Sequence, residues 1–392
     1  MQFADLIAPI AVPDFLAQHW DRAPLHIAAT DARRATPPLS WDDLNALFAQ
    51  QSLWTPDRLK LVMHSRPVDP AHYLIEPAGK PQVGDPARIE HLLAIGASMV
   101  LDHLEDLLPR ARAHADMLAD QFGGVVGANA YASFQGVQAF ASHYDTHEVF
   151  AVQCAGQKKW RIYANRAEAP LNVPQGDGAQ QWIDEAKGPV MMEVMTRRGD
   201  VLYIPRGFFH DAIATDTASL HLTFGVAPYS GRLLFGLLEQ LALADPAFRA
   251  WLPDARVNSG SELLGALADL GDRLAALTRT SALRDAVALA QRKVMQPAHA
   301  VALPTRPTSQ FYARTDRAAH VVREPGGAAL VIDALPEPLG LCADLAEWML
   351  QRPAFSVREA HAQFAWHPPI EVDALIERFV RHGLIRRFQP GS

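Results

Sequence analysis

Three side chains in the middle of the sequence have the types and spacing of an iron-binding set. His143 and Asp145 are separated by one residue, and His210 closes the segment GDVLYIPRGFFH, which begins at Gly199. Alternate residues of a β-strand point to one face, and a strand followed by a Pro-Gly turn could return a third ligand to that face. Two imidazoles and one carboxylate on one side of an octahedral metal leave positions open for a co-substrate and O₂. The pattern therefore predicts a 2-His-1-carboxylate iron site.

A simpler interpretation of the same residues stands beside this one. His143 could be an ordinary turn residue and His210 a hydrogen-bonded histidine of the core, since a His-x-Asp pair alone occurs by chance in many chains. The long segment before His210 makes the pattern more specific. Two further histidines could be ligands, neighbours of the metal, or ordinary polar residues near the pocket: His147 and His221.

Lys158 is the second residue that could take part in chemistry. In the run KKWRIY, strand alternation places Lys158 with Trp160 and Ile162 on the apolar face. A buried unpaired charge is costly, so such a lysine needs an anionic partner, which a dicarboxylate co-substrate would supply. Alternatively, the lysine reaches water at the mouth of a barrel or pairs with a structural carboxylate. Asn129 and Tyr131, further upstream, share one strand face and can hydrogen-bond a carboxylate or a carbonyl.

The region that must position these residues has the pattern of antiparallel β-structure. From about residue 124 to 228, short β-rich runs alternate with Gly, Pro, Asn and Asp, which predicts a sandwich or a barrel. We expect a hairpin in which residues 148–154 and 158–163 flank a turn at 155–157. Further strands are expected at residues 191–195, 201–204 and 220–226.

Helices are expected on both sides of this β region. Before it, residues 13–20 and 84–120 show helical spacing of apolar side chains, and Ser40 is placed to cap a helix start. Pro109 is expected to break or kink the second stretch. After it, two leucine stripes in residues 231–295 predict two or three amphipathic helices, which cover the β core or form a dimer interface.

The rest of the chain is expected to form a linker and a small mixed unit. Residues 296–317 carry three prolines and predict the linker. Beyond it, helices are expected at 341–349, 357–364 and 372–383, with a short strand at 384–388. Three helices and a terminal strand are similar to a winged-helix arrangement. The predicted segments of the whole chain are therefore 1–230, 231–295, 296–317 and 318–392.

The overall composition predicts a soluble cytoplasmic protein. The 392 residues are 49% hydrophobic and 20% charged, with a formal net charge of −7. These values suit a globular protein of two or three domains and argue against a whole-protein nucleic-acid binder. Cys154 and Cys342 are far apart in apolar contexts, so we expect no disulfide framework and no cysteine-based zinc site. We also expect no signal peptide and no membrane span.

Taken together, the motif residues resemble a known family. The pattern HYDxxEVFxxQxxGxKxWxxY, from His143 to Tyr163, is similar to the signature of the JmjC-type, cupin-fold ribosomal oxygenases. Residues from Phe15 to Leu25 resemble a short N-terminal motif of that family. The resemblance covers essentially the whole chain and implies an α+β fold. That fold has a double-stranded β-helix (cupin/JmjC jelly roll) core with helical N-terminal elements, a helical dimerisation region and a C-terminal winged-helix domain.

The resemblance also implies cofactors and residue roles. His143, Asp145 and His210 match the Fe(II) ligands of the family, and Lys158 matches the basic residue that pairs with the distal carboxylate of 2-oxoglutarate. Polar residues of the co-substrate pocket are matched by Asn129 and Tyr131.

The activity that the resemblance implies is that of an Fe(II)- and 2-oxoglutarate-dependent dioxygenase. Such an enzyme uses O₂ and converts 2-oxoglutarate to succinate as it hydroxylates an Arg or His side chain of a ribosomal protein. One position departs from the histidine-hydroxylating relatives, which tend to have Ser where this chain has Gly225, so their substrate choice is not carried over. We expect a ribosomal-protein partner and a homodimer, without a membrane and without direct nucleic-acid binding.

Two other functions stay open at the level of sequence. The same oxygenase chemistry could act on another peptide, on a small molecule or on a methylated lysine. A non-enzymatic alternative is a winged-helix nucleic-acid binder with a degenerate cupin core. Its support is a basic cluster near the C-terminus, which consists of Arg378, Arg381, Arg386 and Arg387.

Overall fold

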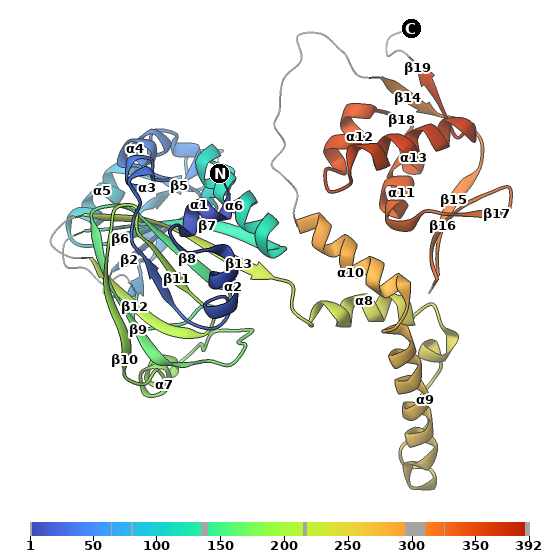
Figure 1. Cartoon of the computed structure of the whole chain (residues 1–392), viewed down its shortest axis with the longest axis horizontal. Helices are drawn as coiled ribbons and strands as arrows, with labels where there is room; N and C mark the ends of the chain where they lie inside the picture. Colours follow the sequence, from blue (N-terminus) through green and yellow to red (C-terminus); the bar gives the residue numbers. More distant parts are fainter. Residues whose placement is uncertain are drawn as a thin grey trace. The chain divides into compact units, whose positions relative to one another are not determined.

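The computed structural model describes residues 2–63, 65–79, 81–134, 140–214, 218–294, 310–324 and 326–388. The chain forms two compact units, residues 1–228 and residues 229–392 (Figure 1). Among the described residues, no helix is both long enough and apolar enough to cross a membrane.

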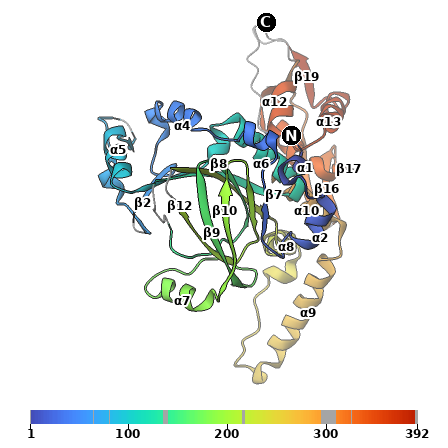
Figure 2. The ribbon, with the colours of Figure 1, turned by 60° about the vertical axis from the view of Figure 1, so that its left-hand side comes forward.

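Two antiparallel sheets form the core of the first unit (Figure 2). The larger sheet has the strand order β1-β11-β8-β13-β7-β6-β2-β3, and the smaller one has the order β10-β9-β12. The larger sheet contains β1 (Leu25–Ile27), β2 (Leu59–Met63), β3 (Arg66–Pro67), β6 (Ser98–Leu101), β7 (Gly124–Ser133), β8 (Glu148–Ala155), β11 (Val201–Ile204) and β13 (Ser219–Pro228). The smaller sheet contains β9 (Gln157–Arg166), β10 (Val190–Arg197) and β12 (Phe208–Ala214). A separate short pair is formed by β4 (Leu74–Ile75) and β5 (Val83–Gly84).

Strand alternation gives β8 two apolar faces with different partners. Phe150 and Val152 pack into the large core cluster that includes the N-terminal helices. Val149 and Ala151 belong to another cluster, together with Trp160 of β9. Successive residues of a strand point to opposite faces, so one face of the larger sheet is covered by helices and the other faces the smaller sheet. The space between the two sheets is where the site lies.

The predicted hairpin around residues 155–157 is wrong. β8 pairs with β11 and β13, whereas β9 pairs with β10 and β12, so the tight turn carries the chain from one sheet to the other. Gly156 has a φ of +63°, and a Cβ atom built on it would lie 2.0 Å from the carbonyl oxygen of Ala218. Only glycine fits such a left-handed position beside a neighbouring segment. A hairpin turn has the same sequence pattern, so alternation and turn residues alone could not distinguish the two.

The helices of the first unit lie mostly before β7. They are α1 (Phe3–Ile7), α2 (Val12–Gln18), α3 (Asp31–Ala35), α4 (Trp41–Phe48), α5 (Pro86–Ala94), α6 (Pro109–Phe122) and α7 (Ala179–Ala186). The helix predicted at residues 13–20 is α2, which ends at Gln18. The predicted cap of α4 is confirmed, because the hydroxyl of Ser40 accepts a hydrogen bond from the backbone N–H of Asp43 at 3.1 Å. α7 lies in the connection between β9 and β10 (Figure 2).

The prediction of a mostly helical stretch at residues 84–120 is partly wrong. α5 ends at Ala94, and Ser98–Leu101 forms β6, whose residues are all buried between β2 and β7. A short buried apolar run can be a strand or a piece of helix, and periodicity does not separate them. Pro109 does not break a helix but begins α6. Proline is favoured there because its missing N–H would have no partner in the first turn.

The second unit consists of three helices followed by a mixed α/β body. The region predicted as helical, residues 231–295, contains α8 (Leu233–Ala242), α9 (Ser261–Leu277) and α10 (Ser281–Val294). The later helices are α11 (Ala343–Gln351), α12 (Val357–Gln363) and α13 (Pro369–Arg381). The strands are β14 (Phe311–Arg314), β15 (Ala319–Glu324), β16 (Gly327–Ile332), β17 (Leu335–Pro338), β18 (Ala354–Ser356) and β19 (Ile385–Phe388).

The C-terminal helices and the terminal strand occur where the sequence predicts them, with ends shifted by a few residues. Five strands were missed, and they form a β15-β16-β17 sheet and, with β19, a β18-β14-β19 sheet. Most of the predicted linker, residues 296–317, lies outside the described residues, but Phe311–Arg314 is strand β14. These strands are short, and β17 is Leu-Pro-Glu-Pro, which carries no strand signal. The winged-helix interpretation stays a prediction.

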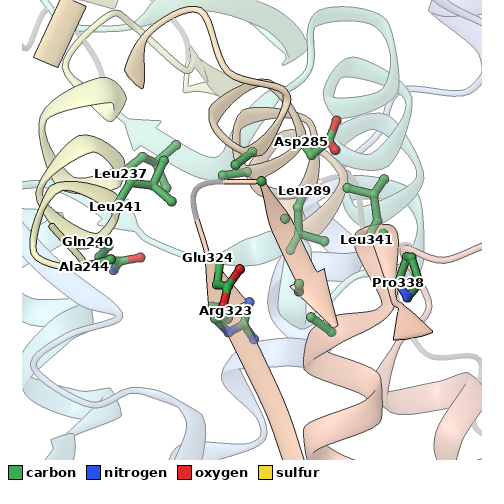
Figure 3. Close-up of a pocket in the computed structure, with 17 residues that line it drawn as sticks. Leu237, Gln240, Leu241, Ala244, Asp285, Leu289, Arg323, Glu324, Pro338 and Leu341 are labelled. Carbon is green, nitrogen blue, oxygen red and sulfur yellow. The ribbon is translucent and has the colours of Figure 1, made fainter. Parts of the chain in front are cut away.

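A cavity of about 280 Å³ lies within the second unit, between α8, α10 and the β15–β16 turn (Figure 3). Leu237 and Leu241 of α8 and Leu289 of α10 contribute apolar side chains to its wall. The charged residue Arg323, at one edge, is paired with Asp344 and Glu347.

Candidate metal centre and co-substrate pocket

His143, Asp145 and His210 lie together in the first unit. One ligand atom from each lies within 4.8 Å of the other two, and Nε2 of His210 is 3.6 Å from Oδ2 of Asp145. Reciprocal backbone hydrogen bonds of 3.0 and 2.8 Å join the two histidines. His210 lies on β12. Strand alternation had predicted that His143 and Asp145 lie on a strand, but they lie in an irregular segment before β8. The backbone bridge, and not alternation, therefore brings the three side chains together.

Both imidazoles present the same nitrogen to the space between them. Nδ1 of His143 lies 3.0 Å from the carbonyl oxygen of Ala141, and Nδ1 of His210 lies 3.0 Å from that of Phe208. A ring nitrogen that donates to a carbonyl holds the proton there and leaves Nε2 with a free lone pair. This is the arrangement that metal-bound histidines have, so the donor set fits a metal ion.

The surroundings shift the pKa values of His210 and Asp145. Burial and the neighbouring His143 lower the pKa of His210 to about 4, so its imidazole is neutral near pH 7. Burial alone would raise the pKa of Asp145, but the nearby charges of His143, His210 and His147 lower it overall. Metal binding requires neutral imidazoles and an ionised carboxylate, and the shifts of His210 and Asp145 are in those directions.

Lys158 is buried in the same space without a counter-ion. Its side chain is on β9, the residue is 2% exposed, and its Nζ lies 3.4 Å from the hydroxyl of Ser133 on β7. Among the described residues no carboxylate pairs with it, and burial lowers the pKa of the amine to about 7. A buried amine of this kind is stabilised as a cation when an anion enters the pocket.

A cavity of about 240 Å³ connects the metal triad with Lys158. His221 of β13 also lines it, with its ring stacked on Tyr131 at a centroid distance of 4.8 Å. Burial and the charge of Lys158 lower the pKa of His221 well below its usual value, so it is neutral. His221 is not part of the metal triad. Its place on β13 opposite the core-facing Leu220 and Leu222 was visible from the sequence, but its role as a wall of the pocket was not. The other lining residues are Phe140, Val149, Trp160, Ala212 and Thr223.

The two polar candidates on β7 differ in position. Tyr131 lines the cavity. Burial and the charges of Asp145 and Asp102 raise the pKa of its phenol, whereas a hydrogen bond with Asn129 acts to lower it. Asn129 does not line the cavity, and its Oδ1 accepts a hydrogen bond from the backbone N–H of His103 at 3.3 Å. Asn129 therefore acts on the pocket through Tyr131. Ser133, which continues the same strand face and contacts Lys158, was not singled out from the sequence although alternation could have found it.

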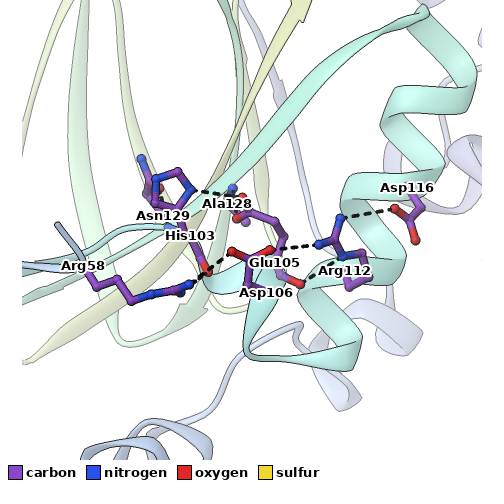
Figure 4. Close-up of polar contacts among 8 residues, drawn as sticks. All are labelled: Arg58, His103, Glu105, Asp106, Arg112, Asp116, Ala128 and Asn129. Carbon is purple, nitrogen blue, oxygen red and sulfur yellow. Dashed lines mark hydrogen bonds and ion pairs between the residues drawn. The ribbon is translucent and has the colours of Figure 1, made fainter. Parts of the chain in front are cut away.

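A network of ion pairs and hydrogen bonds supports β7 at Ala128 (Figure 4). The backbone N–H of Ala128 donates to the carboxylate of Glu105 at 2.8 Å. Beside it, Arg58 and Arg112 both pair with Asp106, at 3.2 and 2.9 Å. These acids are matched by arginines and a backbone donor, so the network supports the strand.

On the other side of the triad, Asp211 ties the two ligand-bearing segments together. Its buried carboxylate accepts hydrogen bonds from Ser142 at 2.8 Å, Tyr163 at 2.7 Å and Arg161 at 2.8 Å. Burial raises the pKa of Asp211, but these three hydrogen bonds outweigh it and lower the pKa overall. Because Ser142 precedes His143 and Asp211 follows His210, the ionised Asp211 positions two of the three ligands.

Gly225, where the histidine-hydroxylating relatives tend to have Ser, lies against the imidazole of His147. A Cβ atom at this position would lie 2.8–3.1 Å from ring atoms of His147. The space that a serine would need is therefore taken by the imidazole of His147. That imidazole also lies close enough to Asp145 to lower its pKa, which places it beside the triad and outside the cavity lining.

Comparison with known proteins identifies the domain that carries this site. Residues 105–233 match the family model of the JmjC domain. This part of the chain is a JmjC domain. The JmjC domain includes the metal triad and Lys158, together with β7 to β13. The predicted JmjC domain and the predicted double-stranded β-helix core with N-terminal helices are both confirmed, whereas membership of the ribosomal oxygenases stays a prediction.

Two curated relatives are similar to the JmjC domain and the residues around it. Ribosomal oxygenase 1 of Gallus gallus is 32% identical over 240 residues, which are 61% of this chain and 38% of that protein. The Drosophila persimilis "Bifunctional lysine-specific demethylase and histidyl-hydroxylase NO66" is 29% identical over 239 residues, 61% of this chain and 33% of that protein. The chain thus spans well under half the length of these curated relatives.

A solved structure matches the fold over nearly the whole chain. YcfD, a ribosomal oxygenase from Escherichia coli in complex with cobalt and 2-oxoglutarate, covers 97% of this chain and 99% of its own, with a TM-score of 0.51 and 17% identity. At this level of identity the likeness concerns the fold alone.

Proposed function

We propose that this JmjC-domain protein is an Fe(II)- and 2-oxoglutarate-dependent oxygenase that hydroxylates an Arg or His side chain of a ribosomal protein. One observation carries the proposal: the His143–Asp145–His210 triad shares a cavity with Lys158, a buried amine that has no carboxylate partner among the described residues. A co-substrate that chelates a metal at one end and carries a second carboxylate at the other fits both features.

Each of these residues has a role that its surroundings support. His143, Asp145 and His210 would hold Fe(II), which with 2-oxoglutarate and O₂ supplies oxidative decarboxylation and hydroxylation of a C–H bond. Lys158 would hold the distal carboxylate as a charge-assisted hydrogen-bond donor, with the Ser133 hydroxyl beside it. Lys158 is 2% exposed, so the ion pair would form away from bulk water, which strengthens it.

The class of substrate rests on the relatives. Ribosomal oxygenase 1 and YcfD are both named as ribosomal oxygenases, and the second curated relative is named as a histidyl-hydroxylase. These names support a ribosomal-protein substrate for this chain, and the expected cytoplasmic location agrees with it. The second relative is also named as a lysine-specific demethylase, so a methylated lysine is the second candidate substrate.

The nucleic-acid alternative has less support. In the second unit, Arg378 pairs with Glu337 at 3.0 Å, and Arg381 lies 3.9 Å from Glu377. Arg387 donates to the hydroxyl of Tyr312 at 3.3 Å. Much of the basic cluster is thus engaged within the protein, and it offers few free cations for phosphates.

The test uses the full chain with Fe(II), 2-oxoglutarate and ribosomal proteins from cells that lack the gene. We expect conversion of 2-oxoglutarate to succinate and a gain of one oxygen on a single ribosomal protein, located by peptide mass spectrometry. The His143→Ala variant should show neither. Full turnover in that variant would refute the iron site. Succinate formation without any oxygen gain on a ribosomal protein would refute the substrate and keep the oxygenase.

A further inference from the structure

A second set of side chains that could hold a metal ion lies in the second unit, with one residue buried and the other two partly exposed. Cys342 immediately precedes α11, His367 lies between α12 and α13, and Glu371 is in the first turn of α13. One ligand atom from each lies within 4.8 Å of the other two. We propose that these three residues form a zinc-binding site that is independent of the JmjC centre.

The distances are close to those of a bound ion. In a tetrahedral zinc site, with bonds of about 2.3 Å to sulfur and about 2.0–2.1 Å to nitrogen and oxygen, ligand atoms lie roughly 3.3–3.6 Å apart. Nδ1 of His367 lies 3.0 Å from Oε2 of Glu371, and the sulfur of Cys342 completes the set within 4.8 Å. Thiolate, imidazole and carboxylate are the three donor types that zinc accepts, and a thiolate disfavours Mg²⁺ or Ca²⁺. Small side-chain movements would therefore close the site around zinc.

The imidazole of His367 has an unused nitrogen in the protein interior. The residue is 3% exposed, and Nε2 has no hydrogen-bond partner among the described residues. A buried polar atom without a partner is unfavourable, and native proteins contain few of them. Because Nδ1 faces the Glu371 carboxylate and serves as the ligand atom in this site, the free Nε2 would carry the ring proton once Nδ1 binds zinc.

Zinc binding would give the site one net positive charge. The metal-free site holds the Cys342 thiol, the Glu371 carboxylate and the guanidinium of Arg292, which lies 3.4 Å from Oε1 of Glu371. Binding of Zn²⁺ releases the thiol proton to solvent and forms one zinc–sulfur bond, with no change of oxidation state. Arg292 can keep its contact with Oε1 while Oε2 faces the metal.

The site joins segments that are distant in the sequence. Cys342 lies at the start of α11, whereas His367 and Glu371 lie at the start of α13, and both helices pack in the core of the second unit. Zinc at this point would fix the two helix starts together. The sequence predicted no cysteine-based zinc site because its two cysteines are far apart in apolar contexts.

The test titrates the metal-free full-length protein with Co²⁺ under anaerobic conditions. The JmjC triad contains no sulfur, so a thiolate-to-cobalt charge-transfer band in the near ultraviolet reports only on the second site. We expect two metal equivalents per chain with this band, and Zn²⁺ should abolish it. His143→Ala should keep the band and bind one equivalent, so failure of the proposed oxygenase function and failure of this proposal are distinguishable.

Two cysteine variants form the matched comparison. Cys342→Ser, a nearly isosteric change, should abolish the band and leave one metal equivalent, whereas Cys154→Ser in the first unit should behave as the unmodified protein. His367→Gln and Glu371→Gln should each weaken cobalt binding at the second site by tenfold or more. The proposal is overturned if the folded unmodified protein, with native circular dichroism, gives no thiolate band, or if the band survives in Cys342→Ser.

Discussion

Lys158 is a buried amine whose expected partner is the distal carboxylate of 2-oxoglutarate. A charged hydrogen bond contributes about 1.5–3 kcal/mol, and each 1.4 kcal/mol is a tenfold change in affinity. Lys158→Met, which keeps the length of the side chain and removes the charge, should therefore raise the KM for 2-oxoglutarate by roughly 10–100-fold.

The control for that variant is the next residue. Lys159 points to the other face of β9 and pairs with Glu193 at 2.7 Å. Lys159→Met should leave the KM unchanged. Steady-state succinate formation over a range of 2-oxoglutarate concentrations measures both, and equal KM values for the two variants would contradict the assigned role of Lys158.

The same lysine predicts a pH dependence of co-substrate binding. Without a partner its pKa is lowered by burial to about 7, whereas a bound carboxylate stabilises the ammonium and raises the pKa toward its ordinary value of about 10.4. Between those two values the empty site holds a neutral amine and the occupied site an ammonium, so binding takes up one proton. The affinity should therefore be highest below pH 7 and fall by up to tenfold per pH unit above it. Calorimetric titration with 2-oxoglutarate in Mn²⁺-loaded protein, from pH 6.5 to 8.5, measures this, and Lys158→Arg should flatten the dependence.

At the scale of elements, one turn decides where the third metal ligand lies. Gly207, between β11 and β12, has a φ of +83°, and a Cβ atom there would lie 2.2 Å from the carbonyl oxygen of Ala167. Its N–H donates to the carbonyl of Asp145 at 2.8 Å. The turn therefore connects the strand that carries His210 with the segment that carries Asp145.

Gly207→Ala should disrupt this turn. The left-handed conformation alone costs about 1–2 kcal/mol for a residue with a Cβ, and the backbone contact adds to it. Gly178, with a φ of +87° and nothing within 4 Å of a Cβ, is the matched control, because its alanine variant meets only the conformational cost. Thermal unfolding followed by tryptophan fluorescence should show a clearly larger loss of stability for Gly207→Ala than for Gly178→Ala, together with weaker Fe(II) binding. An equal loss of stability in both variants would contradict the role of the backbone contact at Gly207.

At the scale of the whole molecule, the second unit exposes an apolar helix. None of the 17 residues of α9 is buried, and its exposed leucines include Leu264 at 69% and Leu267 at 48%. An amphipathic helix normally buries its apolar face. A second copy of this chain is the simplest partner for this face, which agrees with the homodimer expected from the sequence.

The dimer proposal predicts a change of mass in solution. Changing Leu264 and Leu267 together to Asp should convert a dimer to a monomer in sedimentation-velocity experiments, while helix content by circular dichroism is kept. Glu262, two residues before Leu264 and therefore on the opposite side of α9, is the control site, and Glu262→Lys should leave the mass unchanged. A monomeric unmodified protein at micromolar concentration would refute the proposal.

Much of the fold of the first unit was predicted correctly from the sequence, and the predictions that were wrong have a common cause. The strands at 201–204 and 220–226 and the cap at Ser40 depend on local alternation and local hydrogen bonds. The turn at Gly156 and the strand β6 depend on which distant segment lies beside them. Residues 155–157 could close a hairpin or cross between sheets, and only the pairing of β8 and β9 with other strands distinguishes the two.

The iron-binding set was apparent from the sequence by itself because His143, Asp145 and His210 lie within motifs whose residue types specify a chemistry. The tertiary structure decided what surrounds them: a backbone bridge between the two histidines, Asp211 behind them, and Ser133 and His221 beside Lys158. It also brought together Cys342, His367 and Glu371, for which the sequence shows no motif. Side-chain chemistry and periodicity are local properties of a chain, whereas proximity within a few ångströms arises from long-range packing that no local pattern records.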